Sequence, residues 1–311
     1  MTISKRKVIL RKILVILNKE SVVPNRLAEC SAVVVDVFLA TTTITTLLAH
    51  DIEPVYAVEN AEVALQVRYL LSGNTLLLGE SFGYAIDDFI YPDPTLITSQ
   101  LGSTQAIICS TNGTKAIQKA KNAAQLYISS LANGHAIAKA LHEEESDRSI
   151  VIIASGNDGR FSLEDCVGAG QIISHLLPLG DYELSDAAYA AHSLYECIKE
   201  QNFEPLYHTE TVQLLKKMNM DDAVPFVIDT IESMDFAATY EDGQKEDKQR
   251  TLPLSLANFV YRKEDRYFFT GAGYTCMDLI SLDKTDNEEW LLLFLLLLDY
   301  RSEWRNNDII L

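Results

Sequence analysis

The sequence of 311 residues is short of positive charge, since 26 Lys and Arg stand against 44 Asp and Glu, a formal net charge of -18. A field of this sign repels nucleic-acid phosphates and anionic lipid, so we expect no nucleic-acid partner and no membrane partner. Long hydrophobic runs are also scarce. The run Trp290–Leu298 has nine residues, whereas a membrane-spanning helix needs about 20. It predicts a buried helix or a subunit contact.

Cysteine is scarce and scattered. The five cysteines form no CxxC pair, which excludes a zinc-finger pattern and a disulfide framework and favours a reducing compartment. The basic N-terminus is interrupted in its apolar part by Arg11 and Lys12, which is not typical of a signal peptide. We therefore expect a cytoplasmic protein.

Common nucleotide-binding and hydrolase signatures are absent as well. The sequence has no GxxxxGK[ST] loop, no GxSxG elbow and no HExxH pair, and the "GAG" at Gly168–Gly170 is not completed to GxGxxG. Asp36 ends an apolar run but has no second aspartate two residues later. This disfavours an aspartyl-phosphate mechanism.

What the sequence does have is an alternation of short apolar runs and amphipathic segments. Six runs read as strands, at residues 32–38, 53–58, 75–80, 104–110, 125–129 and 149–155. Helical patterns lie between them, and after Ser185 the pattern becomes mainly helical. The alternation predicts an α/β layered fold with a largely parallel or mixed sheet. Ligands bind such sheets at the carboxyl ends of strands, so the loops there are the informative ones.

A charge run, Tyr240–Arg250, is the best linker candidate. It separates the α/β pattern from an aromatic- and leucine-rich end. We predict a domain over residues 1–243 and a C-terminal extension over 244–311, packed on that domain or on a partner subunit.

The loop "STNGTK" (Ser110–Lys115) follows a strand and opens a helix. Gly113 permits close backbone approach, Thr114 is able to cap, and first-turn amides bind anions. Lys115 adds a positive charge. A tight turn with an ordinary cap explains the same residues, and the two readings weigh about equally.

The loop "SGNDGRFSLED" carries Asp158, Glu164 and Asp165, which are candidate magnesium ligands. Taken alone, a capping box between Ser162 and Asp165 explains them better. Glu80 follows another strand. Asp36 at a strand end costs free energy unless it is paired or bound to metal.

Cys109 and Lys115 have the spacing of a cysteine-phosphatase loop, with lysine where that chemistry requires arginine. A thiolate nucleophile needs surroundings that lower its pKa. A buried core cysteine is therefore the favoured interpretation of Cys109.

Together these loops resemble the 2-phosphosulfolactate phosphatase family. The resemblance is carried by "VVVDVFLATTTI", "LLLGESFGYAID", "STNGTKAI", "SSLANGHAIA" and "SGNDGRFSLEDCVGAG", with a weaker match in "LLKKMNMDDAVPFVIDT". It implies a magnesium-dependent acid phosphatase that converts 2-phosphosulfolactate to sulfolactate and phosphate, a step of coenzyme M biosynthesis. It also implies a three-layer α/β/α sandwich and a homodimer.

The resemblance assigns roles to individual residues. The matched positions are Asp36, Glu80, Thr111, Asn112, Gly113, Thr114, Asn133, Gly159, Phe161, Ser162, Glu164 and Asp165. We expect the catalytic carboxylates to be Asp36, Glu80, Glu164 and Asp165. We expect Mg²⁺ at Asp36, Glu80, Asp158 and Asp165. We expect the small anionic phosphomonoester to be held by Thr111, Asn112, Gly113, Thr114, Lys115, Asn133 and Arg160.

The chain departs from the family pattern where arginine is expected. Leu39 and Ser81 replace two arginines, Lys115 replaces a third, and "FIYP" (Phe89–Pro92) replaces a further element. Guanidinium groups bind dianions through paired hydrogen bonds. These losses support an alternative hypothesis, a catalytically impaired family member that acts as an anion-binding or assembly protein.

Overall fold

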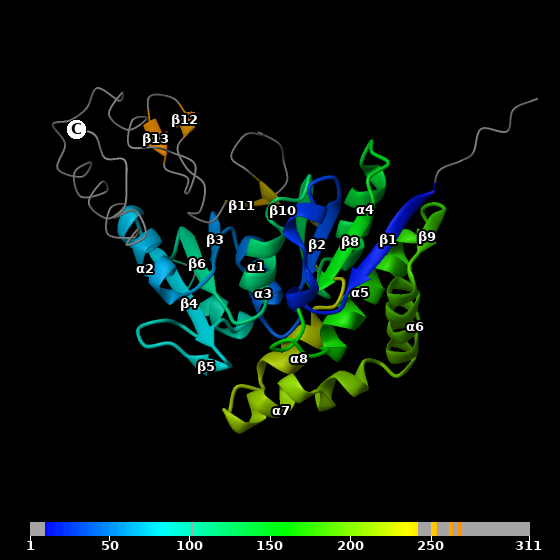
Figure 1. The fold of residues 1–311 in the computed structure, drawn as a ribbon. Helices are drawn as coiled ribbons and strands as arrows, with labels where there is room; N and C mark the ends of the chain where they lie inside the picture. Colours follow the sequence, from blue (N-terminus) through cyan, green and yellow to red (C-terminus); the bar gives the residue numbers. More distant parts are fainter. Residues whose placement is uncertain (1–9, 101, 242–249, 254–260, 264–265, 269–311) are drawn as a thin grey trace, which may run out of the picture. The chain divides into compact units, whose positions relative to one another are not determined.

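The computed structural model describes residues 10–100, 102–241, 250–253, 261–263 and 266–268 (Figure 1). The chain divides into two compact units, Met1–Leu256 and Ala257–Leu311. In the second unit the described part is an antiparallel pair, β12 (Tyr261–Lys263) and β13 (Arg266–Phe268). Residues 242–249 of the expected linker and the run 290–298 lie outside the described residues. The proposed domain boundary at residue 243 stays a prediction.

The larger sheet has seven strands. Their order is β11 (Arg250–Pro253), β10 (Ala238–Glu241), β7 (Gln125–Ser129), β2 (Ser31–Val35), β8 (Ile150–Ala154), β1 (Arg11–Ile16) and β9 (Tyr182–Leu184). All neighbours are parallel except β10 and β7. β2 lies in the middle of this sheet, so its carboxyl end is flanked by the ends of β7 and β8.

The smaller sheet has four strands, in the order β3 (Val55–Val58), β6 (Gln105–Cys109), β4 (Thr75–Ser81) and β5 (Tyr84–Ala85). The first three are parallel, and β5 folds back antiparallel to β4. The sequence pattern does not reveal that the strands divide between two sheets, because order within a sheet is set by long-range packing.

Helices cover both faces of the larger sheet. One face packs on α4 (Gly134–Glu143), α5 (Leu163–Leu176) and α6 (Asp186–Glu200). The other packs on α1 (Ala40–Ala49) and α3 (Gly113–Ala120), which also contact the smaller sheet. α2 (Ala61–Leu70) covers the outer face of the smaller sheet. The three-layer α/β/α sandwich is confirmed, and the smaller sheet extends it.

The side chains of β2 explain why this strand is buried on both faces. Val33 and Val35 point into the core with α4, α5 and α6, whereas Ala32 and Val34 point into the core with α1 and α3. Side chains of a strand alternate between the faces of a sheet, so a sheet covered on both sides needs a continuous apolar run. The six predicted strands are all confirmed.

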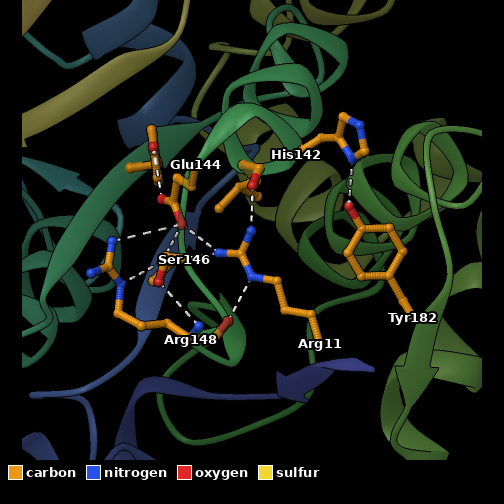
Figure 2. Close-up of polar contacts among 9 residues, drawn as sticks. Arg11, His142, Glu144, Ser146, Arg148 and Tyr182 are labelled. Carbon is orange, nitrogen blue, oxygen red and sulfur yellow. Dashed lines mark hydrogen bonds and ion pairs between the residues drawn. The ribbon is translucent and has the colours of Figure 1, made fainter. Parts of the chain in front are cut away.

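A polar cluster lies at the amino ends of β1, β2 and β8, and we call it the Glu144 cluster (Arg11, Ser31, Tyr127, Glu144 and Arg148). Figure 2 shows Arg11, Glu144 and Arg148 of this cluster. Arg11 pairs with the Glu144 carboxylate, and the Ser31 and Tyr127 hydroxyls donate to it at 2.6 and 2.9 Å. The Arg148 guanidinium lies 3.9 Å from the same carboxylate. Every charge in this cluster has an opposite partner.

The remaining helices are α7 (Glu210–Lys217) and α8 (Ala223–Asp229), which confirm the helical character expected after Ser185. None of the helices in the described ranges is long and apolar enough to cross a membrane.

Candidate active site

A cavity of about 510 Å³ lies at the carboxyl ends of strands from both sheets. The loop after β2 and the turn between β4 and β5 contribute to it, as do the loops after β6 and β8, the start of α5, and α7. Most of the acids singled out in the sequence meet here. The lining carboxylates are Asp36, Glu80, Asp158, Glu164, Asp165 and Glu210.

Asp36 is buried where β2 ends. Its backbone is held by Thr41, whose hydroxyl accepts from the Asp36 N–H at 2.9 Å and donates to the Asp36 carbonyl at 2.7 Å. Burial, together with the charges of Glu80 and Glu164, raises the pKa of the Asp36 carboxyl to about 7, and hydrogen bonds from the Ala40 and Gly113 backbone amides oppose this rise. At neutral pH this carboxyl therefore exchanges its proton readily.

Gly113 makes room for Asp36. A Cβ atom at residue 113 would lie 2.6 Å from Asp36 Oδ2 and 2.7 Å from Ala40 Cβ. Both contacts are shorter than real Cβ atoms show, so glycine is required at this position for the carboxylate to sit where it does.

Asp165 ties two loops together. One carboxylate oxygen accepts from the Val37 N–H at 2.8 Å and the other from the Gly156 N–H at 3.0 Å. Burial, together with the charges of Asp36 and Glu164, holds the pKa of Asp165 well above its ordinary value. Ser162 caps α5 as expected, through the Asp165 N–H at 3.2 Å. The Asp165 carboxylate accepts hydrogen bonds from two loops, so this residue also holds those loops together, which a capping box alone does not explain.

Glu164 is buried beside the start of α7. Burial raises the pKa of its carboxyl, while hydrogen bonds from Thr211, Ser162 and Thr209 work in the opposite direction. Thr209 also caps α7 through the Val212 N–H at 3.3 Å. The first turn of α7 is thus built onto the carboxylate cluster.

Glu80 joins the smaller sheet to the "TNGT" turn. Its carboxylate accepts from the Thr111 N–H and from the Thr111 hydroxyl, the latter at 3.0 Å, and from the Gly83 N–H at 2.7 Å. The Thr111 hydroxyl in turn accepts from the Phe82 N–H at 2.6 Å. The Thr111 amide is therefore engaged by protein and is not free for an anion.

The expected phosphate-binding residues separate into two groups. Thr111, Asn112 and Arg160 line the cavity, whereas Gly113, Thr114, Lys115 and Asn133 are not among its lining residues. Thr114 is buried, and its hydroxyl accepts from the Ser110 N–H at 2.8 Å. The Asn133 amide accepts from the Ser130 N–H at 2.9 Å and donates to the Ile128 carbonyl at 3.2 Å. The Thr114 and Asn133 side chains therefore hold the backbone of their own loops.

The loop after β8 contributes Asp158 and Arg160. The Asp158 N–H donates to Asn112 Oδ1 at 3.1 Å, and Asp158 has a positive φ of 50°. Arg160 pairs with Glu210 of α7 at 2.5 Å, with side chains 61% and 73% exposed. Arg160 therefore lies at the rim and is already neutralised by a carboxylate.

Charge in the cavity is unbalanced. Six carboxylates line it, and the lining Lys and Arg residues are Arg160 and Lys217. Within the described part of the chain, no group of three or more His, Cys, Asp or Glu side chains is arranged to hold a metal ion. Mg²⁺ is commonly bound through one or two carboxylates and keeps several waters. The lining carboxylates supply oxygen donors of the kind that Mg²⁺ takes, and a Mg²⁺ site here would have few protein ligands.

Cys109 does not have the surroundings of a nucleophile. The thiol is buried, and burial together with the charge of Glu80 raises its pKa to about 12, against the opposing charge of Lys115. The thiol stays protonated at neutral pH, which supports the interpretation of Cys109 as a core residue.

The departures from the family pattern have different places. Leu39 is buried and lines the cavity beside Phe38, Tyr91 and Pro92. Ser81 is exposed and is not a lining residue. Of these two replaced arginines, the one at residue 39 is therefore the one whose position lines the cavity.

The sequence patterns did not predict the wall formed by α7. This helix contributes Glu210, Thr211, Gln213, Leu214, Leu215 and Lys217, and His208 lies just before it. The weak motif match beginning at Leu214 was the one available signal, and it lies at the end of this helix.

Comparisons with known proteins agree with the loop pattern. A family model described as 2-phosphosulpholactate phosphatase matches residues 16–243. A "Probable 2-phosphosulfolactate phosphatase" of Carboxydothermus hydrogenoformans is 38% identical over 209 residues, 64% of this chain and 87% of that protein. One of Clostridium perfringens, strain SM101, is 31% identical over 238 residues, 75% of this chain and 95% of that protein. The chain belongs to the 2-phosphosulpholactate phosphatase family.

Proposed function

We propose that the chain is a phosphoric monoester hydrolase that removes phosphate from a small phosphomonoester with the help of Mg²⁺. The names of the relatives point to 2-phosphosulfolactate as the substrate. The observation that carries the proposal is the convergence of Asp36, Glu164 and Asp165 with Glu80 of the other sheet at one cavity.

The charge of the cavity supports a cation requirement. A phosphate dianion would be repelled by the ionised carboxylates of the cavity unless a cation offsets their charge. The pKa of Asp36 is raised by burial and by the charges of Glu80 and Glu164, which is the effect expected when carboxylates repel one another. Asp36 and Glu164 are the candidate ligands, because both carboxyls line the cavity and the charge of Glu164 acts on Asp36, a repulsion that a cation between them would relieve.

The residues would divide the chemistry as follows. Mg²⁺, when bound, would polarise a phosphoryl oxygen and offset charge. Asn112 and Arg160 would orient the phosphate, and Asp165 and Glu80 would keep the loops of the two sheets in register. A cavity carboxylate that is not holding the cation would accept the proton of an attacking water. Leu39, Phe38 and Tyr91 would exclude water from the part of the cavity that holds the organic group of the ester.

The experiment is phosphate release from a panel of small phosphomonoesters that includes 2-phosphosulfolactate, with and without Mg²⁺. We expect release that depends on Mg²⁺ and is lost in Asp36→Asn. Asp87→Asn is the matched control, because Asp87 is exposed and lies outside the cavity lining. Folded wild-type protein that releases no phosphate from any ester would contradict the proposal.

The second candidate function is anion binding without turnover, which Leu39 in the cavity favours. In the same panel it predicts competitive capture of phosphomonoesters without release. The homodimer and the cytoplasmic location remain predictions; sedimentation of the full chain tests the first.

A further inference from the structure

Lys19 is a buried cation behind the cavity that belongs to none of the recognised motifs. Its side chain is 6% exposed, and its ammonium donates to Asn112 Oδ1 at 2.7 Å and pairs with Glu20 at 2.7 Å. Its backbone is fixed as well, because the Lys19 N–H donates to the Ser155 carbonyl at 3.0 Å. Burying an ammonium group costs free energy unless it is paired and hydrogen-bonded.

The contacts of Asn112 determine which way its amide faces. The Asn112 Oδ1 atom receives two donors, the Lys19 ammonium at 2.7 Å and the Asp158 N–H at 3.1 Å. Neither donor group can accept a hydrogen bond, so the oxygen of the amide must face them. The Nδ2 atom lies on the other branch of the planar amide, and Asn112 lines the cavity.

Three loops meet at this amide. Lys19 follows β1, Asp158 follows β8, and Asn112 follows β6 of the smaller sheet. The Lys19–Asn112 contact therefore links the two sheets at the cavity.

We propose that Lys19 is a positioning residue that locks the Asn112 amide with its two N–H bonds toward the cavity, where they donate to oxygens of phosphate or a phosphomonoester. This rests on the proposed function. Without the ammonium, the Asp158 N–H at 3.1 Å is the one remaining donor of the two, so the amide turns its oxygen toward the anion more readily, and that oxygen repels the anion.

Asn112→Asp is the sharpest test, because the two side chains have nearly the same shape. The aspartate keeps an oxygen toward Lys19 and the Asp158 N–H, and it replaces the N–H bonds facing the cavity by a second oxygen. We expect the inhibition constant of inorganic phosphate to rise at least tenfold while the urea midpoint of unfolding is unchanged or higher. An unchanged inhibition constant would overturn the proposal.

Lys19→Met tests the lock itself. We expect KM and the phosphate inhibition constant to rise about tenfold with kcat changed less than threefold, and Lys19→Arg to restore most of the affinity. Lys119→Met is the matched control, since Lys119 donates to the Lys19 carbonyl at 2.8 Å and is not a lining residue. It should leave phosphate affinity unchanged.

The double variant Lys19→Met, Asn112→Ala separates positioning from a general structural role. If Lys19 acts through Asn112, the double variant binds phosphate no more weakly than Asn112→Ala. Additive losses, or a lower unfolding midpoint in Lys19→Met with unchanged phosphate affinity, would overturn the proposal.

Failure of the proposed function gives a different result. If wild-type protein releases no phosphate from any ester, calorimetry with inorganic phosphate decides the role of Lys19. Weaker binding in both Asn112→Asp and Lys19→Met would uphold it. Equal binding in all variants, or no binding to wild type, would overturn it.

Discussion

Two buried carboxylate clusters lie at opposite ends of the strands of the larger sheet, and they differ in whether the carboxylates have cationic partners. In the Glu144 cluster, one carboxylate is surrounded by two guanidinium groups and two hydroxyls (Figure 2). In the cavity, Asp36 and Asp165 face other carboxylates, and their pKa values are raised by burial and by those charges. Strongly perturbed pKa values cluster at functional sites. The comparison therefore assigns stability to one end of the sheet and chemistry to the other.

Breaking the paired cluster should give the largest change in stability. Arg11→Met removes the guanidinium that contacts Glu144, with side chains 10% and 9% exposed, and leaves a buried charge with less compensation. We expect a loss of about 3–5 kcal/mol in the free energy of unfolding, measured by urea denaturation.

Lys12→Met is the matched control for Arg11→Met. Lys12 is the next residue and pairs with Glu183, but their side chains are 43% and 60% exposed. We expect a change below about 1 kcal/mol. Equal losses in the free energy of unfolding for the two variants would show that the Glu144 cluster contributes no more to stability than an exposed ion pair.

The cavity cluster should make stability fall as pH rises. The pKa of Asp36 is raised from 3.8 to about 7, so the folded state holds a proton that the unfolded state has released between these values. Without divalent cations, we expect unfolding free energy to fall by about 3 kcal/mol between pH 5 and pH 8. The raised pKa values of Glu164 and Asp165 act in the same direction.

Adding Mg²⁺ tests this pH dependence. Mg²⁺ should restore the free energy of unfolding at pH 8 and have little effect on it at pH 5, where Asp36 is protonated. Stability that is flat or rises from pH 5 to pH 8 without divalent cations would contradict the assignment of unpaired charge to the cavity.

Removing one cavity charge should stabilise the fold and destroy activity. We expect Asp36→Asn to gain about 2 kcal/mol at pH 8 and little at pH 4, where the wild-type carboxyl already carries its proton. Urea denaturation at the two pH values measures this difference. A loss of stability at pH 8 would mean that Asp36 is held by favourable contacts that outweigh the repulsion.

The smallest effect is expected at the rim. Glu210→Gln releases Arg160 from a pair whose side chains are 61% and 73% exposed, so stability should change by less than about 1 kcal/mol. Inorganic phosphate should bind about threefold more tightly, because a carboxylate is lost and a guanidinium is freed. Weaker binding would show that Glu210 orients Arg160 productively.

Much of the fold could be predicted from local pattern. Residues 32–38 form a strand because β-branched side chains fit a sheet that is covered on both faces. β1 was not predicted, because Arg11 and Lys12 make its start resemble a charged N-terminal segment. Arg11 is instead buried against Glu144. A sequence pattern places a charged residue such as Arg11 on the protein surface. Its burial becomes evident only in the fold, which brings the Glu144 carboxylate next to it.

The candidate site could be predicted where residues sit at strand ends. Asp36 and Glu80 reach the cavity from such positions, and Asp165 reaches it from the first turn of α5, after the loop that follows β8. Lys19 could not, because it follows a strand that was itself not predicted, and its partner Asn112 is 93 residues away. Asn133 has the expected motif, yet the fold turns its amide onto neighbouring backbone groups.

The contact between Gly113 and Asp36 has a consequence for how the family can vary. A Cβ at residue 113 would collide with Asp36 Oδ2 at 2.6 Å and with Asp36 Cβ at 2.9 Å. Residues 36 and 113 are therefore epistatic. A lineage that keeps the carboxylate is confined to glycine at 113. Replacing Asp36 by glycine removes these two conflicts and leaves the contact with Ala40 Cβ at 2.7 Å. An alignment in which alanine at 113 accompanies glycine at both 36 and 40 would mark the members that have given up the chemistry.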